Sequence, residues 1–396
     1  MMIQRFSIAR FPRIEFGAGT IEKLPAMAAD FGKRALLVTG AASLQQSPRW
    51  QPLQQGLRCA GIQWEHTTVS GEPSPGLVDA VVNEFRDLQP DVVIAIGGGS
   101  VLDAGKAIAG LLRTGDSVMD YLEGVGPEKP YAGPAVPFIA APTTAGTGSE
   151  ATKNAVLSIQ GEHGFKKSFR DERLVPEYAI VDPDLLDGCP PGQIAANGMD
   201  ALTQLMESYV STRANRMTDT LALDGIRAAR DSLLPLYENP ATAGGAREGM
   251  AYAALLSGIT LAQTGLGSVH GLASPLGAFF PIPHGVVCGT LVAAATRVNI
   301  QAMQAREPEN PALEKYTRLA SLLCGSGFSD AQNAYDALTD LLADWIRQLN
   351  IPRLGRYDIK ERDFPRIVAN SRGSSMKTNP VVLTDGEIAA ILQQRL

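Results

Sequence analysis

Two kinds of hydrophobic pattern follow each other along the chain and change near residue 187. In the first part, short runs rich in β-branched residues alternate with amphipathic stretches, and glycine, proline or aspartate bounds each run. Such runs predict β-strands, whereas an apolar spacing near 3.6 predicts helices. We expect strands within 34–40, 91–100, 137–149 and 177–183, and helices within 74–88 and 100–113. This alternation predicts a parallel sheet covered on both faces, with ligands at the carboxyl ends of its strands.

The second part of the chain shows no strand pattern. Its alanine- and leucine-rich segments have helical spacing and are separated by glycine and proline. They predict helices at 194–213, 216–236, 246–264, 285–303, 311–325 and 330–349. A chain of 396 residues is long for one core. We therefore expect an α/β domain with a parallel sheet at 1–187 and an all-α domain at 188–396.

Composition narrows the classes of partner. The net charge is −6, so the chain has no basic field that would attract nucleic acid or an anionic membrane. No apolar run reaches the ~20 residues of a bilayer span, and the N-terminal stretch has no signal-peptide core. The four cysteines are widely spaced and form no CxxC pair, as expected for reduced thiols in a cytoplasmic protein.

A run of glycines ends one predicted strand. In "DVVIAIGGGSVLDAGKA", Gly97, Gly98, Gly99 and Ser100 lead from the strand into a helix. Bare backbone amides at a helix N-terminus can approach a phosphate, and the helix dipole favours its charge. The stretch is not a P-loop, because Ser100 stands where the first glycine belongs, and it does not fit GxGxxG. A tight turn needs fewer glycines, so the run favours phosphate binding.

A second loop of this kind is "PTTAGTGSEAT", residues 142–152. It places Thr143, Thr144, Thr147 and Ser149 among glycines after another predicted strand. Hydroxyls and free amides at this density suit a ribose, another polyol or a phosphate. Because both loops follow strands of one sheet, a dinucleotide cleft explains them better than a plain polar loop.

Histidines and a carboxylate indicate a further kind of chemistry. Only four histidines occur, and we expect His270 and His284 to flank an apolar loop, "GLASPLGAFFPIP". On a predicted helix, Asp200 and Gln204 lie one turn apart and share a face. Neutral imidazoles and a carboxylate suit Fe(II), Zn(II) or a similar ion. From these residues alone, a weakened metal site, a metal-free relic and an ordinary polar helix all remain open.

Several stretches, taken together, closely resemble the iron-containing (group III) alcohol dehydrogenase family, of which glycerol dehydrogenase and dehydroquinate synthase are more distant relatives. The motifs are "GGGSVLDAGKAIA", "PTTAGTGSE", "GMDALTQLMESYVS" and "VHGLASPLGAFFPIPHG", and the likeness extends from residue 11 to residue 388. The resemblance implies a nucleotide-binding domain, a helical domain and a metal between them. It also implies NAD(P)-dependent interconversion of an alcohol with an aldehyde or ketone, and a homodimer or higher homo-oligomer.

The resemblance assigns the catalytic and metal-binding residues. The family's aspartate falls on Asp200 and two of its histidines on His270 and His284, while a third histidine falls on Gln204. We expect the site to persist, with the amide oxygen of Gln204 as a weaker ligand and Fe²⁺, or else Zn²⁺, as the ion. A further family histidine falls on Ser274, which leaves a water chain or the ribose hydroxyls as proton carriers. Cys288 is expected to pack in the core.

The resemblance also assigns the cofactor. An acidic residue that accepts the adenosine ribose 2′-OH in the family falls on Gly40, with Ser43 nearby, which opens the site to NADP without forbidding NAD. Lys166 matches a family lysine near the nicotinamide. The expected cofactor-binding residues are Gly40, Ser43, Gly97, Gly98, Gly99, Ser100, Asp103, Thr143, Thr144, Thr147, Ser149 and Lys166.

Two alternatives stay open at this point. One is a metal-independent reductase of the maleylacetate reductase type, and the other is a nucleotide-binding protein without turnover. The substrate is expected to be a small alcohol or aldehyde. Phe279 and Phe280 lie in the apolar stretch 274–283. They suggest an apolar pocket wall and a modest or apolar substrate.

Overall fold

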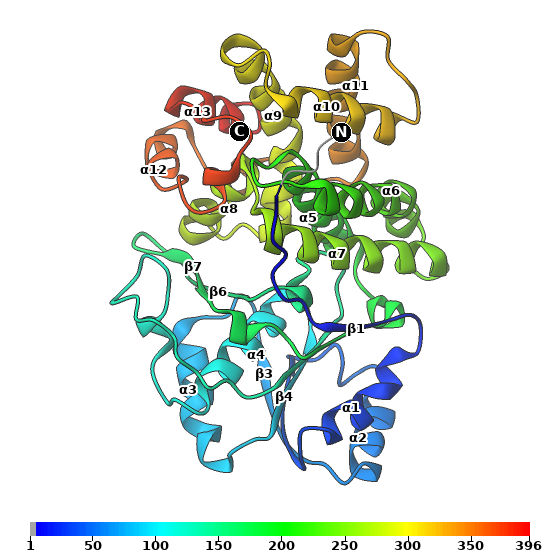
Figure 1. The fold of residues 1–396 in the computed structure, drawn as a ribbon, viewed down its shortest axis with the longest axis vertical. Coiled ribbons are helices and arrows are strands. Elements are labelled where there is room, and N and C mark those ends of the chain that lie inside the picture. Colours follow the sequence, from blue (N-terminus) through cyan, green and yellow to red (C-terminus); the bar gives the residue numbers. More distant parts are fainter. Residues whose placement is uncertain (1–4) are drawn as a thin grey trace.

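The predicted parallel sheet is present in the computed structural model, which describes residues 5–396 (Figure 1). Its strand order is β1-β8-β5-β4-β2-β3, and every neighbouring pair is parallel. A separate antiparallel pair, β6 and β7, follows β5 in the chain. The strands are β1 (Arg13–Phe16), β2 (Arg34–Gly40), β3 (Gln63–Val69), β4 (Val92–Gly97), β5 (Phe138–Pro142), β6 (Asn154–Ile159), β7 (Phe165–Arg170) and β8 (Tyr178–Val181).

The strands that the hydrophobic pattern predicted are the inner ones β2, β4, β5 and β8, whereas β1, β3, β6 and β7 were missed. The missed strands lie at the two edges of the sheet or in the separate hairpin. β3 reads "QWEHTTV" and has only one fully buried residue. A strand that is exposed along one side carries few apolar residues, so its sequence lacks the run by which a buried strand is recognised.

Helices cover both faces of the sheet, as predicted. On one face lie α1 (Leu24–Ala29) and α2 (Trp50–Cys59), and on the other α3 (Pro75–Phe85) and α4 (Gly99–Leu111). Within β4, Val93 and Ala95 join the core beneath α3 and α4, while Ile94 and Ile96 join the core beneath α1 and α2. Because successive side chains of a strand point to opposite faces, a strand buried on both sides must be apolar throughout.

The described residues beyond β8 contain helices and no strand. Figure 1 shows this helical part stacked on the sheet-containing part. The six predicted helices are present, and three further helices were not predicted. The elements are α5 (Pro191–Val210), α6 (Arg216–Glu238), α7 (Gly244–Thr264), α8 (Ser268–Phe279), α9 (His284–Arg306), α10 (Pro311–Cys324), α11 (Ala331–Gln348), α12 (Phe364–Ala369) and α13 (Asp385–Gln393).

α8 corrects the expectation that His270 and His284 flank a loop. Its N-cap, Gly267, supplies no side-chain hydrogen bond. Instead, the carboxylate of Glu207 accepts the N–H of Val269 at 2.7 Å, and the amide oxygen of Asn379 accepts the N–H of Ser268 at 3.0 Å. Residues distant in the sequence thus accept the free N–H groups at the start of this helix, so the local sequence does not indicate where the helix begins.

α9 is the central helix of this part and packs against α5, α8 and α11. It is long and apolar enough to cross a membrane, but 89% of its most apolar window is buried inside the protein, so its core position accounts for its composition. Two glycines bring α9 close to α5. A Cβ on Gly285 would lie 2.5 Å from the carbonyl oxygen of Ala196, and one on Gly289 would lie 3.0 Å from the Cβ of Met199.

Candidate active site

Asp200, His270 and His284 meet although they come from three different helices. Asp200 lies within α5, His270 in the first turn of α8, and His284 is the first residue of α9. Nε2 of His270 lies 3.2 Å from Oδ1 of Asp200, and Nε2 of His284 lies 3.8 Å from the same oxygen. Asp200 is 1% exposed, while a quarter of the His284 side chain remains accessible.

Glu207 orients the His270 ring. Nδ1 of His270 donates to Oε2 of Glu207 at 2.6 Å, while Oε1 of the same carboxylate accepts the N–H of Val269 at 2.7 Å. Both ring nitrogens of His270 therefore face carboxylates. A neutral ring that donates through Nδ1 presents a lone pair to Asp200, so a cation, either a proton or a metal ion, belongs between Nε2 and Asp200.

The electrostatics of this buried cluster favour a bound cation. Burial lowers the pKa of His284 to about 4, which leaves its ring neutral and able to coordinate at neutral pH. Burial opposes the ionised form of Asp200, but its electrostatic interactions with His284 and His270 outweigh burial and lower its pKa. Burial also opposes protonation of His270, yet Cys288 and Glu207 raise its pKa well above the usual value. The site thus attracts positive charge, and the donor set fits Fe²⁺ or Zn²⁺.

Cys288 is buried as expected, but its sulfur faces this cluster. Sγ lies 3.5 Å from Nε2 of His270 and 3.8 Å from Nε2 of His284. One ligand-type atom from each of Asp200, His270, His284 and Cys288 falls within a group whose members are all within 4.8 Å of one another. The expectation that this thiol packs in the core is confirmed, and its sulfur in addition lies beside the metal-ligand cluster.

Gln204 lies beside the cluster, but its amide oxygen has a different partner from the one predicted. Oε1 accepts a hydrogen bond from the hydroxyl of Ser257 on α7 at 2.7 Å. The residue is 3% exposed and borders the same cavity as His270 and His284. The helix thus brings Gln204 to the predicted place, and Ser257 turns its oxygen toward α7.

The two predicted nucleotide loops touch each other at the carboxyl edge of the sheet. Gly97 at the end of β4 pairs with Pro142 at the end of β5. A Cβ on Gly99 would lie 2.7 Å from Oγ1 of Thr147, so only glycine allows the two loops to approach this closely. Gly98 has the extended backbone of an N-cap and offers no side chain, which leaves the first N–H groups of α4 uncovered by a side-chain cap.

Two neighbouring cavities divide the predicted cofactor-binding residues between them. One, of about 180 Å³, is lined by Gly40, Ser43, Gly97, Gly98, Thr143 and Thr144. The other, of about 480 Å³, is lined by Gly99, Ser100, Asp103, Thr147, Ser149 and Lys166, together with Gln204, His270, Ser274 and His284. The glycine run separates the two cavities, so an extended dinucleotide crossing it reaches the metal-ligand cluster at one end.

Asp103 and Ser149 face each other rather than standing free. Ser149 donates its hydroxyl to Oδ1 of Asp103 at 2.5 Å, and Oδ2 of Asp103 accepts the N–H of Val156 at 3.1 Å. The buried ammonium of Lys106 donates to both oxygens of Ser149, at 2.8 and 2.9 Å. Burial lowers the pKa of Lys106 to about 8. These three side chains hold the threonine-rich loop and β6 against α4, a role that the sequence did not reveal.

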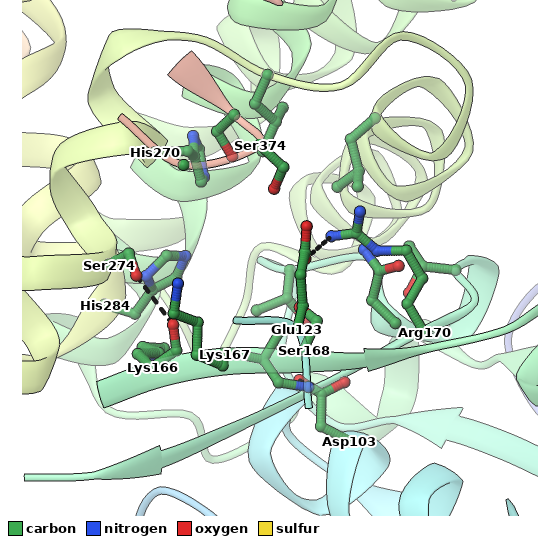
Figure 2. A pocket seen from close by; sticks show the side chains of 18 of the residues that line it. Asp103, Glu123, Lys166, Lys167, Ser168, Arg170, His270, Ser274, His284 and Ser374 are labelled. Carbon is green, nitrogen blue, oxygen red and sulfur yellow. Dashed lines mark hydrogen bonds and ion pairs between the residues drawn. The ribbon is translucent and has the colours of Figure 1, made fainter. Parts of the chain in front are cut away.

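Lys166 reaches the cavity from β7, next to His284 (Figure 2). Its ammonium lies 2.7 Å from Oε2 of Glu72, and its carbonyl oxygen accepts the hydroxyl of Ser274 at 2.9 Å. Ser274, which stands where the family has a histidine, therefore donates its hydroxyl hydrogen to a backbone carbonyl. Glu72 was not singled out from the sequence, because its loop carries no motif.

The expectation that Phe279 and Phe280 form an apolar wall of the larger cavity was wrong, because its lining mixes apolar with charged and polar residues from other segments. Neither phenylalanine lines this cavity. The guanidinium carbon of Arg366 lies 3.7 Å from the centre of the Phe279 ring instead. Figure 2 shows the side chains of Glu123 and Arg170 meeting in an ion pair at the cavity wall. Nη2 of Arg170 lies 3.5 Å from Oε2 of Glu123.

Glu207 was not predicted and Cys288 was assigned only to the core, although both had a weak sequence signal. Glu207 lies seven residues after Asp200 and hence on the same helical face, and Cys288 lies four residues after His284. Such spacings are common between core positions, so spacing alone does not separate a metal-supporting residue from an ordinary buried one.

The parallel sheet is covered on both faces and carries nucleotide loops at its carboxyl edge, and the helical part beside it carries a metal-ligand cluster. This combination defines a metal-assisted, nicotinamide-dependent oxidoreductase. The iron-containing alcohol dehydrogenase family model matches residues 12–183, and the model of the C-terminal part of Fe-containing alcohol dehydrogenases matches residues 194–396. The chain belongs to the iron-containing alcohol dehydrogenase family. It is an NAD(P)-dependent enzyme that interconverts alcohols with aldehydes or ketones.

Individual relatives align over nearly the whole chain. Alcohol dehydrogenase 4 of Saccharomyces cerevisiae is 34% identical over 390 residues, covering 96% of this chain and 95% of the yeast protein. The crystal structure of a 1,3-propanediol oxidoreductase superposes with a TM-score of 0.89 at 31% identity, covering 99% and 100% of the two chains. The sulfoacetaldehyde reductase of Bifidobacterium kashiwanohense, solved with NAD⁺, superposes with a TM-score of 0.84 at 28% identity, covering 99% of each chain.

Proposed function

We propose that hydride transfer takes place in the cavity of about 480 Å³, with Asp200, His270 and His284 as the metal-binding and catalytic residues. One observation supports this most strongly: Ser100 of the glycine-rich loop borders the same cavity as His270 and His284. A nicotinamide positioned by the loops lies beside a substrate held at the cluster, and this proximity lowers the barrier to a two-reactant step.

Each part of the cluster has a distinct role. Asp200, His270 and His284 hold the ion, and Glu207 fixes the orientation of His270. When bound, the divalent ion supplies Lewis-acid polarisation of the substrate oxygen. The cluster is otherwise buried among helices, which keeps water away from the reacting centre.

The cofactor follows the edge of the sheet. Backbone amides from Gly98 to Ser100 bind the diphosphate at the start of α4. The adenosine half occupies the smaller cavity, where Gly40 and Ser43 lie beside the ribose. The nicotinamide half lies near Lys166, which its contact with Glu72 holds in place. The remaining predicted residues, Gly97, Asp103, Thr143, Thr144, Thr147 and Ser149, shape these loops or contact the cofactor.

Organisation and location complete the proposal. We place the domain boundary near residue 187. The change from strands to helices between β8 and α5, and the gap between the two family matches, support this position. A homodimer or higher homo-oligomer follows from the family resemblance. The acidic net charge and unpaired cysteine pattern support a cytoplasmic enzyme without nucleic-acid or membrane partners.

The test combines metal analysis with turnover. Purified protein is assayed for NAD(P)H oxidation over a panel of aldehydes before and after chelation, and again after Fe²⁺ or Zn²⁺ is restored. We expect chelation to abolish activity and the metal to recover it. His284→Ala should lower kcat/KM by ~100-fold or more, because several kcal/mol of charge stabilisation is lost. His163→Ala, at an exposed histidine, is the matched control.

Other outcomes identify the alternatives. Activity that survives chelation and is unaffected by His284→Ala indicates a metal-independent reductase of the maleylacetate type. Nucleotide binding without turnover on any aldehyde indicates a non-enzymatic role. Either result contradicts the proposal.

A further inference from the structure

We propose that the thiolate of Cys288 is the fourth protein ligand of the ion and occupies the place that the sequence assigns to Gln204. This inference rests on the proposed metal site and concerns which side chains complete it. The ligand set becomes Asp200, His270, His284 and Cys288. It gives the site a sulfur donor that favours zinc-type over magnesium-type ions.

Four of the six separations between the ligand atoms are close to those of a tetrahedral site, and all six are within 4.8 Å. With bond lengths of ~2.0–2.3 Å, tetrahedral ligand atoms lie ~3.3–3.8 Å from each other. Around Cys288, Sγ lies 3.5 Å from Nε2 of His270 and 3.8 Å from Nε2 of His284. Around Asp200, Oδ1 lies 3.2 and 3.8 Å from the same two nitrogens. One ion therefore reaches all four atoms with little movement of any side chain.

The position of Cys288 also leaves room for a substrate. Its side chain is fully buried and does not line the cavity, whereas both histidines do. The sulfur therefore approaches the ion from the protein side, and the cavity side stays open. A substrate oxygen on the cavity side would be a fifth ligand, and zinc sites with a catalytic role can expand to five-coordinate.

Gln204 is less suited to this role in the structure. Its amide oxygen accepts the Ser257 hydroxyl at 2.7 Å, and coordination would require this buried hydrogen bond to break. A thiolate is also the stronger ligand for zinc-type ions, and with Asp200 it supplies two negative charges that balance a divalent cation. An ordinary core position offers no reason for a thiol to lie within 4 Å of two imidazole nitrogens.

The decisive experiment is spectroscopic and does not depend on turnover. Wild-type protein loaded with Co²⁺ should show a near-ultraviolet sulfur-to-cobalt charge-transfer band. Cys288→Ser should lose this band and lower the Zn²⁺ affinity, measured against a chromophoric chelator, by ~10-fold or more. Gln204→Ala, and Cys189→Ser at a cysteine away from the cluster, should keep both the band and the affinity. X-ray absorption of the wild-type zinc form should show one sulfur at ~2.3 Å, a result that needs no variant to fold.

The outcomes separate this inference from the proposed function. A metal shell of nitrogen and oxygen only, in a protein whose metal binding is lost in Asp200→Asn, overturns the role of Cys288 and leaves the site itself standing. A loss of affinity in Gln204→Ala but not in Cys288→Ser also overturns it. If wild-type protein binds no metal and works without it, the proposed metal site fails as well.

Discussion

Glu207 connects the protein scaffold to the metal-ligand cluster, and its replacement by glutamine tests this connection. The carboxylate accepts Nδ1–H of His270 through one oxygen and the N–H of Val269 through the other. Glutamine has nearly the same shape, but only one of its two terminal atoms accepts a hydrogen bond. In Glu207→Gln, one of these two buried donors must therefore face an NH₂ group.

The cost follows from these two bonds. Leaving one buried donor unsatisfied costs about 1–3 kcal/mol, and the bonds at 2.6 and 2.7 Å are charge-assisted. If the Val269 N–H loses its partner, the start of α8 weakens and the protein loses stability. If His270 loses its partner, the tautomer that presents Nε2 to the ion is no longer fixed. Supporting carboxylates of this kind contribute ~10–100-fold to metal affinity, or about 1.4–2.7 kcal/mol.

Two measurements separate the effects. Zn²⁺ affinity from chelator competition should fall by ~10–100-fold in Glu207→Gln, while denaturant unfolding of the metal-free protein reports the change at α8. Glu238→Gln, at an exposed glutamate near the end of α6, is the control and should change neither quantity. A folded Glu207→Gln protein whose metal affinity stays within ~3-fold of the wild type would refute the argument. A 3-fold change corresponds to only about 0.65 kcal/mol of binding free energy, which is less than the predicted loss.

Three further substitutions test other parts of the structure. Gly40→Asp should weaken NADP(H) binding by ~10–100-fold through repulsion of the 2′-phosphate and leave NAD(H) binding unchanged. The new side chain has room, because a Cβ at this position meets nothing closer than 3.8 Å. An equal loss of NADP(H) affinity in Gly40→Asn would contradict a charge effect. Gly99→Ala should raise the KM for the nucleotide by about tenfold and cost about 1–3 kcal/mol of stability, because its Cβ would meet Thr147 at 2.7 Å. The double variant with Thr147→Ala should recover part of both losses. If the effects of the two substitutions on KM and stability simply add, the contact is not their cause. Burial raises the pKa of Glu150 from 4.5 to about 7. Between these pH values the folded state keeps the proton and the unfolded state releases it, so the stability of the wild type falls as pH rises from 4.5 to 7. In denaturant unfolding, Glu150→Gln should therefore be more stable than the wild type by up to about 3 kcal/mol at pH 8 but by little at pH 4.5. A Glu150→Gln gain that is equal at both pH values would contradict burial as its cause.

The sheet and its nucleotide loops were predictable because their signals are local. β4 is buried on both faces, so its run of apolar residues is continuous, and Gly97 to Gly99 follow it directly. In a parallel sheet the carboxyl ends of neighbouring strands lie together, so adjacent loops can be inferred to meet. Gly99 and Thr147 do meet, at the distance that excludes a side chain on the glycine.

The surroundings of the metal-ligand cluster were less predictable because their causes are distant in the chain. α8 begins where it does because Glu207 and Asn379 accept its first N–H groups. The pattern around His270 showed apolar and small residues with glycine and proline, which favoured a loop. The direction of Phe279 likewise depends on Arg366, whose approach to this ring no local pattern indicates.

The same reasoning explains why a ligand can move from one helix to another while the site persists. α5 and α9 approach each other closely at Gly285 and Gly289, where a side chain would overlap Ala196 or Met199. This contact fixes the distance between the helices, so positions one turn beyond Asp200 on α5 and one turn beyond His284 on α9 both lie beside the proposed metal site. A position-by-position sequence comparison shows that glutamine replaces the family's histidine at position 204. It does not notice that Cys288, four residues after His284, lies within 4 Å of the same ligands, because proximity here is set by helix packing rather than by order along the chain.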